Sequence, residues 1–329
     1  MRSPALQAED VQMQVAIIGA GIAGVACARV LDGAGHEVVV LDRGHAAGGR
    51  LASRNVAGRT VDLGASYLTA RDPAFLAVVE DWVARGVARA WTDTFRIGSP
   101  TGLGERKQGP VRYGAARGLR SLVDDLAAGL DVRQQVEVQR VGPGPTVDGT
   151  AYDAVVLAMP DPQALRLLST ELAAERVALE DRAWQPVLAL AAGWSRRAWD
   201  LDGVFVHDCE VLDWVADDGA RRGDAAPVLV AHSTAAFATP RLSNPDAAGP
   251  ALLTAVRGLL DLPEPAWSLV QRWTYAKPVG DRAAAYLLGG AGIGLCGDGW
   301  GAAKVEGAWL SGTALGQALL SGAGQTRPS

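Results

Sequence analysis

The first residues suited to chemistry form a glycine-rich turn followed by an acid. The pattern G-x-G-x-x-G is made by Gly19, Ala20, Gly21, Ile22, Ala23 and Gly24. Glycines at these positions permit a tight turn and let a pyrophosphate approach the start of a helix. Asp42 comes 18 residues after Gly24, where an acid can accept hydrogen bonds from adenosine ribose hydroxyls. This spacing predicts a dinucleotide site; the alternative is a plain turn in which Asp42 only ends a strand.

A second run of residues suits contacts with phosphate and with a flat ring. Gly48, Gly49 and Arg50 follow the acid, and the run DLGASY starts at Asp62. Arg50 offers a planar fork of donors to phosphate oxygens, and Gly64 lets the backbone come against a flat ring. The alternative for Arg50 is an ordinary surface salt bridge.

Apolar strands and a helix with a small-residue face must position these groups. Gln14 to Ile18 is a continuous apolar run, typical of a strand that is buried on both faces of a parallel sheet. The next segment carries small residues on one helical face, and Gly33 ends it. His36 to Asp42 predicts a second strand. Together these elements predict a β-α-β unit with a right-handed parallel crossover.

Further elements follow in the rest of the chain. Apolar residues with helical spacing over residues 119–130 predict a helix, and alternation from Gln135 to Val141 predicts a strand. Ala154 to Met159 predicts another buried strand. Strand and glycine turn return from Ile293 to Gly301, and a last helix is expected from about Lys304 to Leu320.

Composition narrows the class of protein. The chain has 329 residues, a formal net charge of −5 and a pI near 5.5, so it has no basic field to attract nucleic acid or an anionic membrane. It has no apolar run of about 18 residues and no apolar stretch of the secretory type near its start, so we expect a cytoplasmic location. Three widely spaced cysteines and four histidines without ligand spacing predict no metal site.

These motifs resemble those of the flavin monoamine oxidase and phytoene desaturase superfamily, in which the G-G-R turn lies along the FAD pyrophosphate. The segment CGDGW, residues 296–300, matches the one whose Asp bonds the flavin ribityl chain. A turn-forming Asp is the alternative for Asp298. The helix that opens at Val305 and Glu306 would face the N1 and O2 edge of the flavin, where its positive end favours the anionic reduced ring.

The resemblance implies one non-covalent FAD and names the residues that would hold it. Val136 matches the position whose backbone meets the adenine, although plain strand packing explains it equally well. The implied cofactor residues are Gly19, Gly21, Ile22, Ala23, Gly24, Asp42, Arg43, Gly49, Arg50, Gly64, Ala65, Ser66, Val136, Gly297, Asp298, Val305 and Glu306.

Four aromatic residues are candidates for the walls of a substrate pocket, namely Tyr67, Trp273, Tyr275 and Trp300. Flat aromatic faces could hold a ring against the flavin. Core packing is the alternative for each of them. No residue stands out as an acid or base for catalysis.

Within the superfamily the sequence is most similar to renalase and its bacterial relatives. The likeness runs through VAIIGAGIAG, GGRLASR, DLGASYLT, DAVVLAMP, RWTYAKP, CGDGW and VEGAWLSG. Renalase-like enzymes oxidise dihydro isomers of NAD(P) and pass the electrons to O2, which yields hydrogen peroxide. The alternatives are a flavin oxidase of a small amine and a non-catalytic FAD-binding protein.

The resemblance also implies an α/β fold of the amine oxidase type. We expect a Rossmann-type FAD-binding domain with a parallel sheet, made from residues 12–70, 111–170 and 271–322. A second, α+β substrate domain would comprise residues 71–110 and 171–270. Residues 171–270 hold many of the Trp residues and lack a β-α-β signal, so their role is not predicted.

Overall fold

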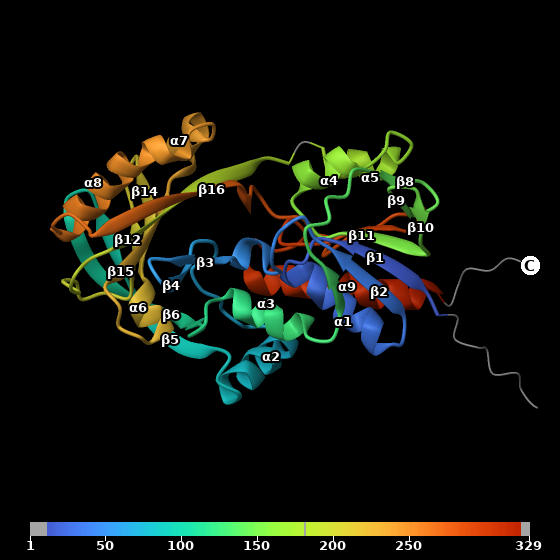
Figure 1. The fold of residues 1–329 in the computed structure, drawn as a ribbon, viewed down its shortest axis with the longest axis horizontal. Coiled ribbons are helices and arrows are strands. Elements are labelled where there is room, and N and C mark those ends of the chain that lie inside the picture. The colour runs from blue at the N-terminus through green and yellow to red at the C-terminus, as the bar shows by residue number, and fades with distance from the viewer. Residues whose placement is uncertain (1–11, 181, 324–329) are drawn as a thin grey trace, which may run out of the picture.

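Two sheets lying side by side organise the chain (Figure 1). The computed structural model describes residues 12–180 and 182–323. The first sheet has the strand order β17 (Leu287–Leu288), β18 (Ile293–Leu295), β11 (Ala154–Leu157), β1 (Gln14–Ile18), β2 (Glu37–Leu41) and β7 (Asp131–Arg133). Its neighbouring strands are parallel, except that β17 runs antiparallel to β18. The predicted parallel sheet is confirmed.

Helices cover both faces of this sheet, because its central strands are apolar on both sides. Around the face of Val15 and Ile17 lie α1 (Ile22–Gly33), α2 (Pro73–Ala84), α3 (Arg120–Ala127) and α9 (Val305–Ala323). Around the face of Ala16 and Ile18 lie α4 (Asp161–Leu167) and the chain next to α5 (Ala173–Val177). Helices α1 and α9 approach so closely that a Cβ on Gly312 would lie 1.9 Å from the Ala23 carbonyl oxygen. The first and last helices of the fold therefore form one layer.

The strand predicted from Gln135 to Val141 is wrong for most of its length. Only β8 (Val141–Gly142) is a strand there. The Gln135 amide donates to the Gly44 carbonyl oxygen at 2.9 Å, and the Val136 amide donates to the Asp42 carbonyl oxygen at 3.0 Å. These bonds tie the segment to the loop after β2 and replace those of a regular ladder. Gln135 also has a φ of +59°, which interrupts extended backbone.

The second sheet has seven strands. Their order is β16 (Trp267–Pro278), β12 (Trp184–Gly193), β15 (Val228–Ser233), β14 (Leu212–Asp217), β13 (Gly203–Val206), β5 (Arg89–Ser99) and β6 (Gly102–Gly114). Leu188 and Leu190 on one face pack with Leu252 and Val256 of α8 (Gly249–Leu260). The other face of the sheet turns toward the first half of the molecule, as Figure 1 shows.

Shorter elements complete the description. The β3 (Ser53–Val56) and β4 (Arg59–Asp62) hairpin lies between the two sheets, and β8 pairs with β9 (Thr146–Val147), which pairs with β10 (Thr150–Ala151). The remaining elements are α6 (Asp218–Arg222), α7 (Ala235–Ala238) and the 3-10 helices η1 (Gly49–Leu51), η2 (Thr239–Arg241) and η3 (Pro245–Ala248). Within the described ranges, no helix has the length and apolar character needed to cross a membrane.

Two segments pack differently from the expected domain boundaries. Helix α2 was expected in the substrate domain, but its Phe75, Val79 and Trp82 are fully buried in the core of the parallel sheet. Strand β16 was expected in the FAD-binding domain, but it is the edge strand of the second sheet. In both cases the apolar face of the element decides which sheet it joins.

Candidate functional site

The first glycine turn is shaped by close backbone contacts. The Gly19 amide donates to the Leu41 carbonyl oxygen at 2.8 Å, and Gly19 has a φ of +112°. A Cβ on Gly24 would lie 2.0 Å from the Gly19 carbonyl oxygen, so both positions require glycine. A Cβ on Gly21, in contrast, would have no heavy atom within 4 Å. Gly21 therefore borders open space at the carboxyl ends of the strands.

The start of α1 faces that open space without a partner from a side chain. Gly21 is the N-cap of α1, no side chain caps the helix, and its first turn carries no acid. The first backbone amides of a helix have no partner within the helix, and the helix dipole is positive at this end. The turn formed by Ile22, Ala23 and Gly24 therefore suits an anionic group.

Asp42 joins two loops at the end of β2. Its two carboxylate oxygens accept from the Ala20 amide and from the Gly44 amide, both at 2.7 Å. Each oxygen can accept a further hydrogen bond, so the predicted contact with a ribose stays open. The Val136 amide is used by the Asp42 carbonyl oxygen, as described above, so that amide is not free for an adenine. Arg43 is exposed beside this turn.

Arg50 joins the glycine turn after β2 to the C-terminal loop. Its Nη1 donates to Asp298 Oδ2 at 2.7 Å, and its Nη2 donates to Asp298 Oδ1 at 2.5 Å. The same Nη1 donates to the Ala276 carbonyl oxygen at 3.1 Å, and the guanidinium lies 5.2 Å from the ring centre of Trp184. Gly49 carries the chain into this position with a φ of +53°. Arg50 thus makes a salt bridge, but its partner is mostly buried, so the pair differs from the ordinary surface salt bridge given as the alternative.

The segment after β4 lies directly against Arg50. A Cβ on Gly64 would lie 1.9 Å from the Arg50 carbonyl oxygen, and the Ala65 amide donates to that oxygen at 2.9 Å. Gly64 is thus required by a neighbouring backbone. The sequence predicted that the Gly64 backbone comes close to a flat ring. The structure shows it close to the backbone of Arg50.

The second half of the molecule holds the same segment from the other side. Trp273 Nε1 donates to the Leu63 carbonyl oxygen at 2.7 Å. Trp214 Nε1 donates to Ser66 Oγ at 2.9 Å, and Arg221 Nη1 donates to the Ser66 carbonyl oxygen at 2.7 Å. Sequence motifs gave no signal for Trp214 or Arg221. They fix where residues 63–66 stand between the sheets.

A buried ionic network supports this junction. Asp62, Asp218 and Arg221 are all at most 1% exposed, and Arg221 Nη2 donates to Asp218 Oδ1. Arg222 Nη1 lies 3.3 Å from Asp62 Oδ2. Burial raises the pKa of the Asp62 carboxyl, while the neighbouring Arg221 lowers it. The cations of α6 thereby offset the cost of burying Asp62 at the end of β4.

The C-terminal loop offers a second open edge. Gly297 has a φ of +140°, and a Cβ there would have no heavy atom within 4 Å. Its amide donates to Ser311 Oγ at 2.9 Å, which fixes the loop on α9. The Glu306 Oε1 accepts from the Arg71 and Asp72 amides at 2.6 and 2.7 Å. The Glu306 carboxylate therefore holds the chain before α2, and Val305 is half-buried at the helix start.

The four predicted pocket residues fall in different environments. Trp273 and Tyr275 are half-buried on β16. Tyr67 packs in an aromatic cluster with Phe95 at 5.4 Å, and burial raises the pKa of its phenol. Trp300 is 5% exposed and belongs to the core behind the parallel sheet. Trp300 is therefore a core residue, and its predicted role as a pocket wall is not supported.

His232 on β15 is a candidate that the sequence did not single out. It is half-buried, and its buried Nε2 has no hydrogen-bond partner among the described residues. Burial lowers the pKa of His232 to about 3; Lys277 and Arg221 act in the same direction, and a hydrogen bond to the Gly64 backbone opposes them. The imidazole is therefore neutral at physiological pH and lies beside the segment that follows β4.

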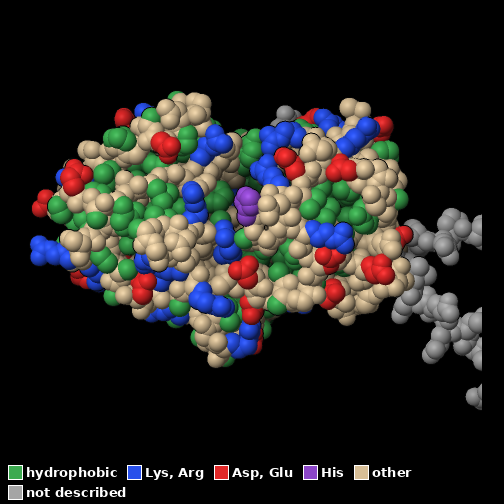
Figure 2. All heavy atoms as spheres, in the orientation of Figure 1, with side chains coloured by type: hydrophobic (Ala, Val, Ile, Leu, Met, Phe, Trp, Pro, Cys, Tyr) green, Lys and Arg blue, Asp and Glu red, His purple; other side chains and the backbone are tan. Residues whose placement is uncertain are grey.

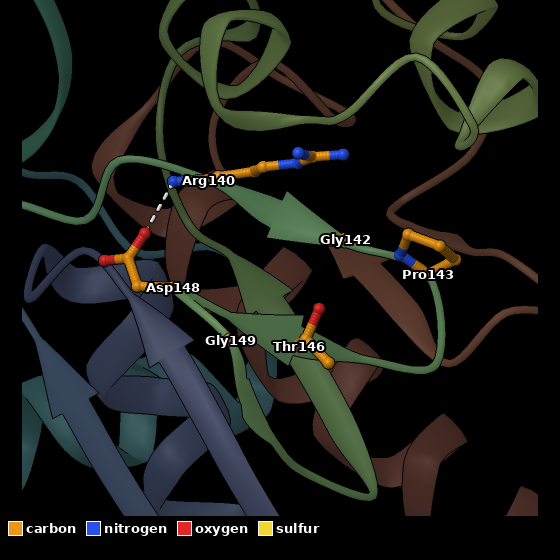
Figure 3. Close-up of a pocket in the computed structure, with 6 residues that line it drawn as sticks. All are labelled: Arg140, Gly142, Pro143, Thr146, Asp148 and Gly149. Atoms are coloured by element: carbon orange, nitrogen blue, oxygen red, sulfur yellow. Dashed lines mark hydrogen bonds between the residues drawn. The ribbon is translucent and has the colours of Figure 1, made fainter.

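Two other hollows lie away from this crevice. One, of about 240 Å³, borders the β8 and β9 hairpin, where the Arg140 amide donates to Asp148 at 2.8 Å (Figure 3). The Arg140 guanidinium also pairs with Glu171 at 3.2 Å. The other, of about 330 Å³, is lined by Arg117, Ser121, Asp124 and Asp125 near α3. The polar groups of Arg140 and Asp148 at the first hollow already have partners within the protein. Neither hollow adjoins the crevice residues described above.

Comparison with known proteins agrees with the position of the glycine turn. The NAD(P)-binding Rossmann-like domain matches residues 17–82. A Mycobacterium tuberculosis protein described as the flavin-containing monoamine oxidase AofH is 32% identical over 149 residues, which cover 40% of this chain and 32% of AofH. A 4,4'-diapophytoene desaturase of Staphylococcus aureus is 28% identical over 141 residues, which cover 39% of this chain and 28% of the desaturase. The chain spans about a third of the length of these relatives.

Solved structures match almost the whole chain. One described as a protoporphyrinogen oxidase from Exiguobacterium sp. 255-15 has a TM-score of 0.76 at 14% identity, and the match covers 95% of this chain and 99% of that one. Putrescine oxidase bound to putrescine has a TM-score of 0.71 at 17% identity, with the same coverage. The chain therefore has the fold of these oxidases. This confirms the fold class expected from the motifs, and the two relatives above agree with the expected likeness to flavin monoamine oxidases and phytoene desaturases.

This fold brings most of the predicted residues to one crevice. The Gly19 turn, Asp42, Arg50 and Asp298 meet there because they follow strands whose carboxyl ends share one edge of the parallel sheet. Gly64 joins them from the hairpin between the sheets. Trp300 does not line this crevice.

Proposed function

We propose that the chain binds one FAD non-covalently in the crevice between the Gly21 turn and the Asp298 loop and acts as an oxidoreductase. In detail, we propose a renalase-like oxidase whose substrate is a dihydro isomer of NAD(P) and whose electron acceptor is O2. The observation that carries the proposal is the Arg50 ion pair with Asp298, which brings the two predicted cofactor segments together. The match to a flavin-containing relative over 149 residues supports the choice of flavin.

The residues present fit an FAD along this crevice. Open space borders both Gly21 and Gly297, where any side chain would project toward a cofactor. The uncapped start of α1 suits the pyrophosphate, and Asp42 has acceptor capacity left for a ribose. Trp273 lies 3.4 Å from the place of a Cβ on Gly64, so ring and backbone together form a flat wall for the flavin.

FAD held there would supply a two-electron acceptor: the dihydronicotinamide would lose a hydride and become NAD(P)+, and the two electrons, with the proton of the hydride and one proton from solvent, would reduce O2 to hydrogen peroxide. A dihydronicotinamide has no N–H or O–H proton to lose from its reacting ring, so the protein needs to position the ring more than to move a proton. Trp273 and Tyr275 on β16 are the residues best placed for this. His232, neutral beside Gly64, would offer a hydrogen bond without adding charge.

Oxidation of a small amine is the second candidate. The match to AofH, a protein described as a monoamine oxidase, over 149 residues favours it. Putrescine oxidase shares the fold at 17% identity, which shows the fold alone. The two candidates differ in the charge of their substrates, because amines are cationic and dinucleotides are anionic.

Anaerobic stopped-flow absorbance separates the candidates on the purified holoprotein. We expect 2- and 6-dihydronicotinamide dinucleotides to bleach the flavin band within seconds, with hydrogen peroxide formed once O2 is admitted. Bleaching by putrescine or another amine, with the dihydro isomers inert, would establish the amine oxidase. A flavin that no donor reduces would leave a non-catalytic FAD-binding protein.

A further inference from the structure

Cations gather at the mouth of the crevice although the chain as a whole is acidic. Figure 2 shows Lys and Arg side chains around the hollow between the two halves of the molecule. The formal net charge of the chain is −5, so composition does not explain this arrangement. Such a concentration of one sign of charge draws ligands of the opposite sign.

Arg166 is the most informative cation for this crevice, because its contacts place it between α4 and β16. It lies on α4, and its Nη1 donates to the hydroxyl oxygen of Tyr275 on β16 at 3.3 Å. The guanidinium carbon lies 5.7 Å from the Tyr275 ring centre. Its place in the last turn of α4 accounts for a cation there, but not for its direction toward the opposite sheet. The pair closes one side of the crevice between the two halves.

Most other cations in the same region already have a carboxylate partner. Arg50 pairs with Asp298, Arg282 with Asp161 at 3.0 Å, and Lys277 with Asp213 at 3.2 Å. Among residues 12–180 and 182–323, Arg166 has no carboxylate partner. Its exposed guanidinium retains donors for a ligand.

Strand geometry relates Arg166 to the flavin wall. Trp273 and Tyr275 are two residues apart on β16, a spacing of about 7 Å, and Tyr275 lies where the pairing with β12 becomes irregular. Trp273 bonds the Leu63 carbonyl oxygen next to Gly64. If a substrate ring is held at Trp273, a group attached to that ring can reach Tyr275 and Arg166, which lie two residues further along β16 and beside it.

We propose that Arg166, supported by the Tyr275 ring, is the subsite for an anionic group of the substrate, a phosphate or a carboxylate. This inference rests on the proposed function, because it takes the ring beside Trp273 as the reacting part of the substrate. It assigns the dinucleotide's phosphates to a specific residue. It also explains how the crevice would disfavour a cationic amine.

Paired donors and a matched control test the subsite. Arg166→Gln and Arg166→Glu are compared with Arg272→Gln. Arg272 is an exposed residue of β16 whose Nη1 donates to the Leu242 carbonyl oxygen. The donors are a dihydronicotinamide adenine dinucleotide and the phosphate-free 1-methyl dihydronicotinamide of the same ring isomer. We expect Arg166→Gln to slow flavin reduction by the dinucleotide roughly tenfold, Arg166→Glu to slow it more, and neither to change reduction by the methyl compound. Arg272→Gln should change neither rate.

A binding measurement tests the subsite even if the protein has no oxidase activity. Titration calorimetry of the holoprotein with NADP+ should give a dissociation constant roughly tenfold higher in Arg166→Gln than in the wild type. If NADP+ binding depends on Arg166 while no dihydro isomer bleaches the flavin, the subsite stands and the oxidase is wrong. The subsite is wrong if the Arg166 variants slow flavin reduction by both donors equally, or if they leave reduction by the dinucleotide unchanged. It is also wrong if the wild-type protein binds neither NADP+ nor inorganic pyrophosphate.

Discussion

Arg50 and Asp298 lie 248 residues apart in the chain and share two hydrogen bonds of 2.7 and 2.5 Å. Arg50 follows the Gly48–Gly49 turn after β2, and Asp298 follows β18 on the far side of β11. An arginine fork against a carboxylate is a strong and directional pair when partly buried. Arg50 is 29% and Asp298 13% exposed at the side chain. The pair therefore fixes the width of the crevice in which we place the flavin.

Replacing Arg50 by Lys should weaken FAD binding. Lysine keeps the positive charge but cannot donate in parallel to both oxygens of Asp298. We expect the dissociation constant for FAD to rise about tenfold, which corresponds to roughly 1.4 kcal/mol, in a fluorescence titration of apoprotein. Arg54→Lys is the control, because exposed Arg54 bonds only Gln271. Equal FAD affinity in both variants would contradict a cofactor role for the Arg50 pair.

Gly21→Ala should fold normally and lose the cofactor. The added methyl group meets no protein atom within 4 Å, and Gly21 has a φ of −75°, which alanine adopts freely. The methyl group would instead occupy the space assigned to the pyrophosphate. We expect an unchanged melting temperature of the apoprotein and a dissociation constant for FAD at least about tenfold higher. Gly33→Ala, equally open but at the far end of α1, should change neither; a loss of FAD there as well would refute this assignment.

The acid stability of the fold should depend on His232. Between pH 6.5 and about 3 the unfolded chain protonates this imidazole and the folded chain does not. Stability is therefore lost as the pH falls through this window, by up to roughly 1.4 kcal/mol per pH unit from one group. Urea unfolding of wild type and His232→Gln at pH 7, 6 and 5 measures it. The variant should show the shallower pH dependence, and parallel profiles would show that His232 can protonate in the folded state.

Arg221→Met should destabilise the protein strongly. The change leaves Asp218 and Asp62 buried with one cation fewer and removes the donor to the Ser66 carbonyl oxygen. Breaking a buried ion pair typically costs about 3–5 kcal/mol, which urea unfolding would detect. Arg133→Met, which breaks the exposed pair with Asp131, should have a much smaller effect on stability, because solvent screens such a pair. Similar small losses in both variants would mean that the network adds little to stability.

Sequence reasoning succeeded where backbone geometry dictates the residue. The Gly19 turn and the Asp298 loop could be placed together because strands of a parallel sheet end at one edge. It failed where a contact depends on distant side chains. Glu306 was expected at the cofactor, yet its carboxylate binds the amides of Arg71 and Asp72, and Trp300 packs into the core. No local pattern marks such partners, because tertiary packing selects them.

The middle of the chain shows the same limit. His232, Trp214 and Arg221 all reach the segment after β4, but none belongs to a motif. Only the folded structure shows that these side chains face the crevice. Alternation along a strand does not say which face of the second sheet turns toward it. The sequence likewise offered no reason to choose Arg166, because its contact with Tyr275 appears only in the folded structure.

Titration of apoprotein with FAD by calorimetry tests the central claim most directly. If the Gly21 turn and the Asp298 loop together form the cofactor site, one FAD binds per chain, and Gly21→Ala and Asp298→Ala each weaken it. Absence of FAD binding by the folded wild-type apoprotein, or full affinity in both variants, would contradict the account.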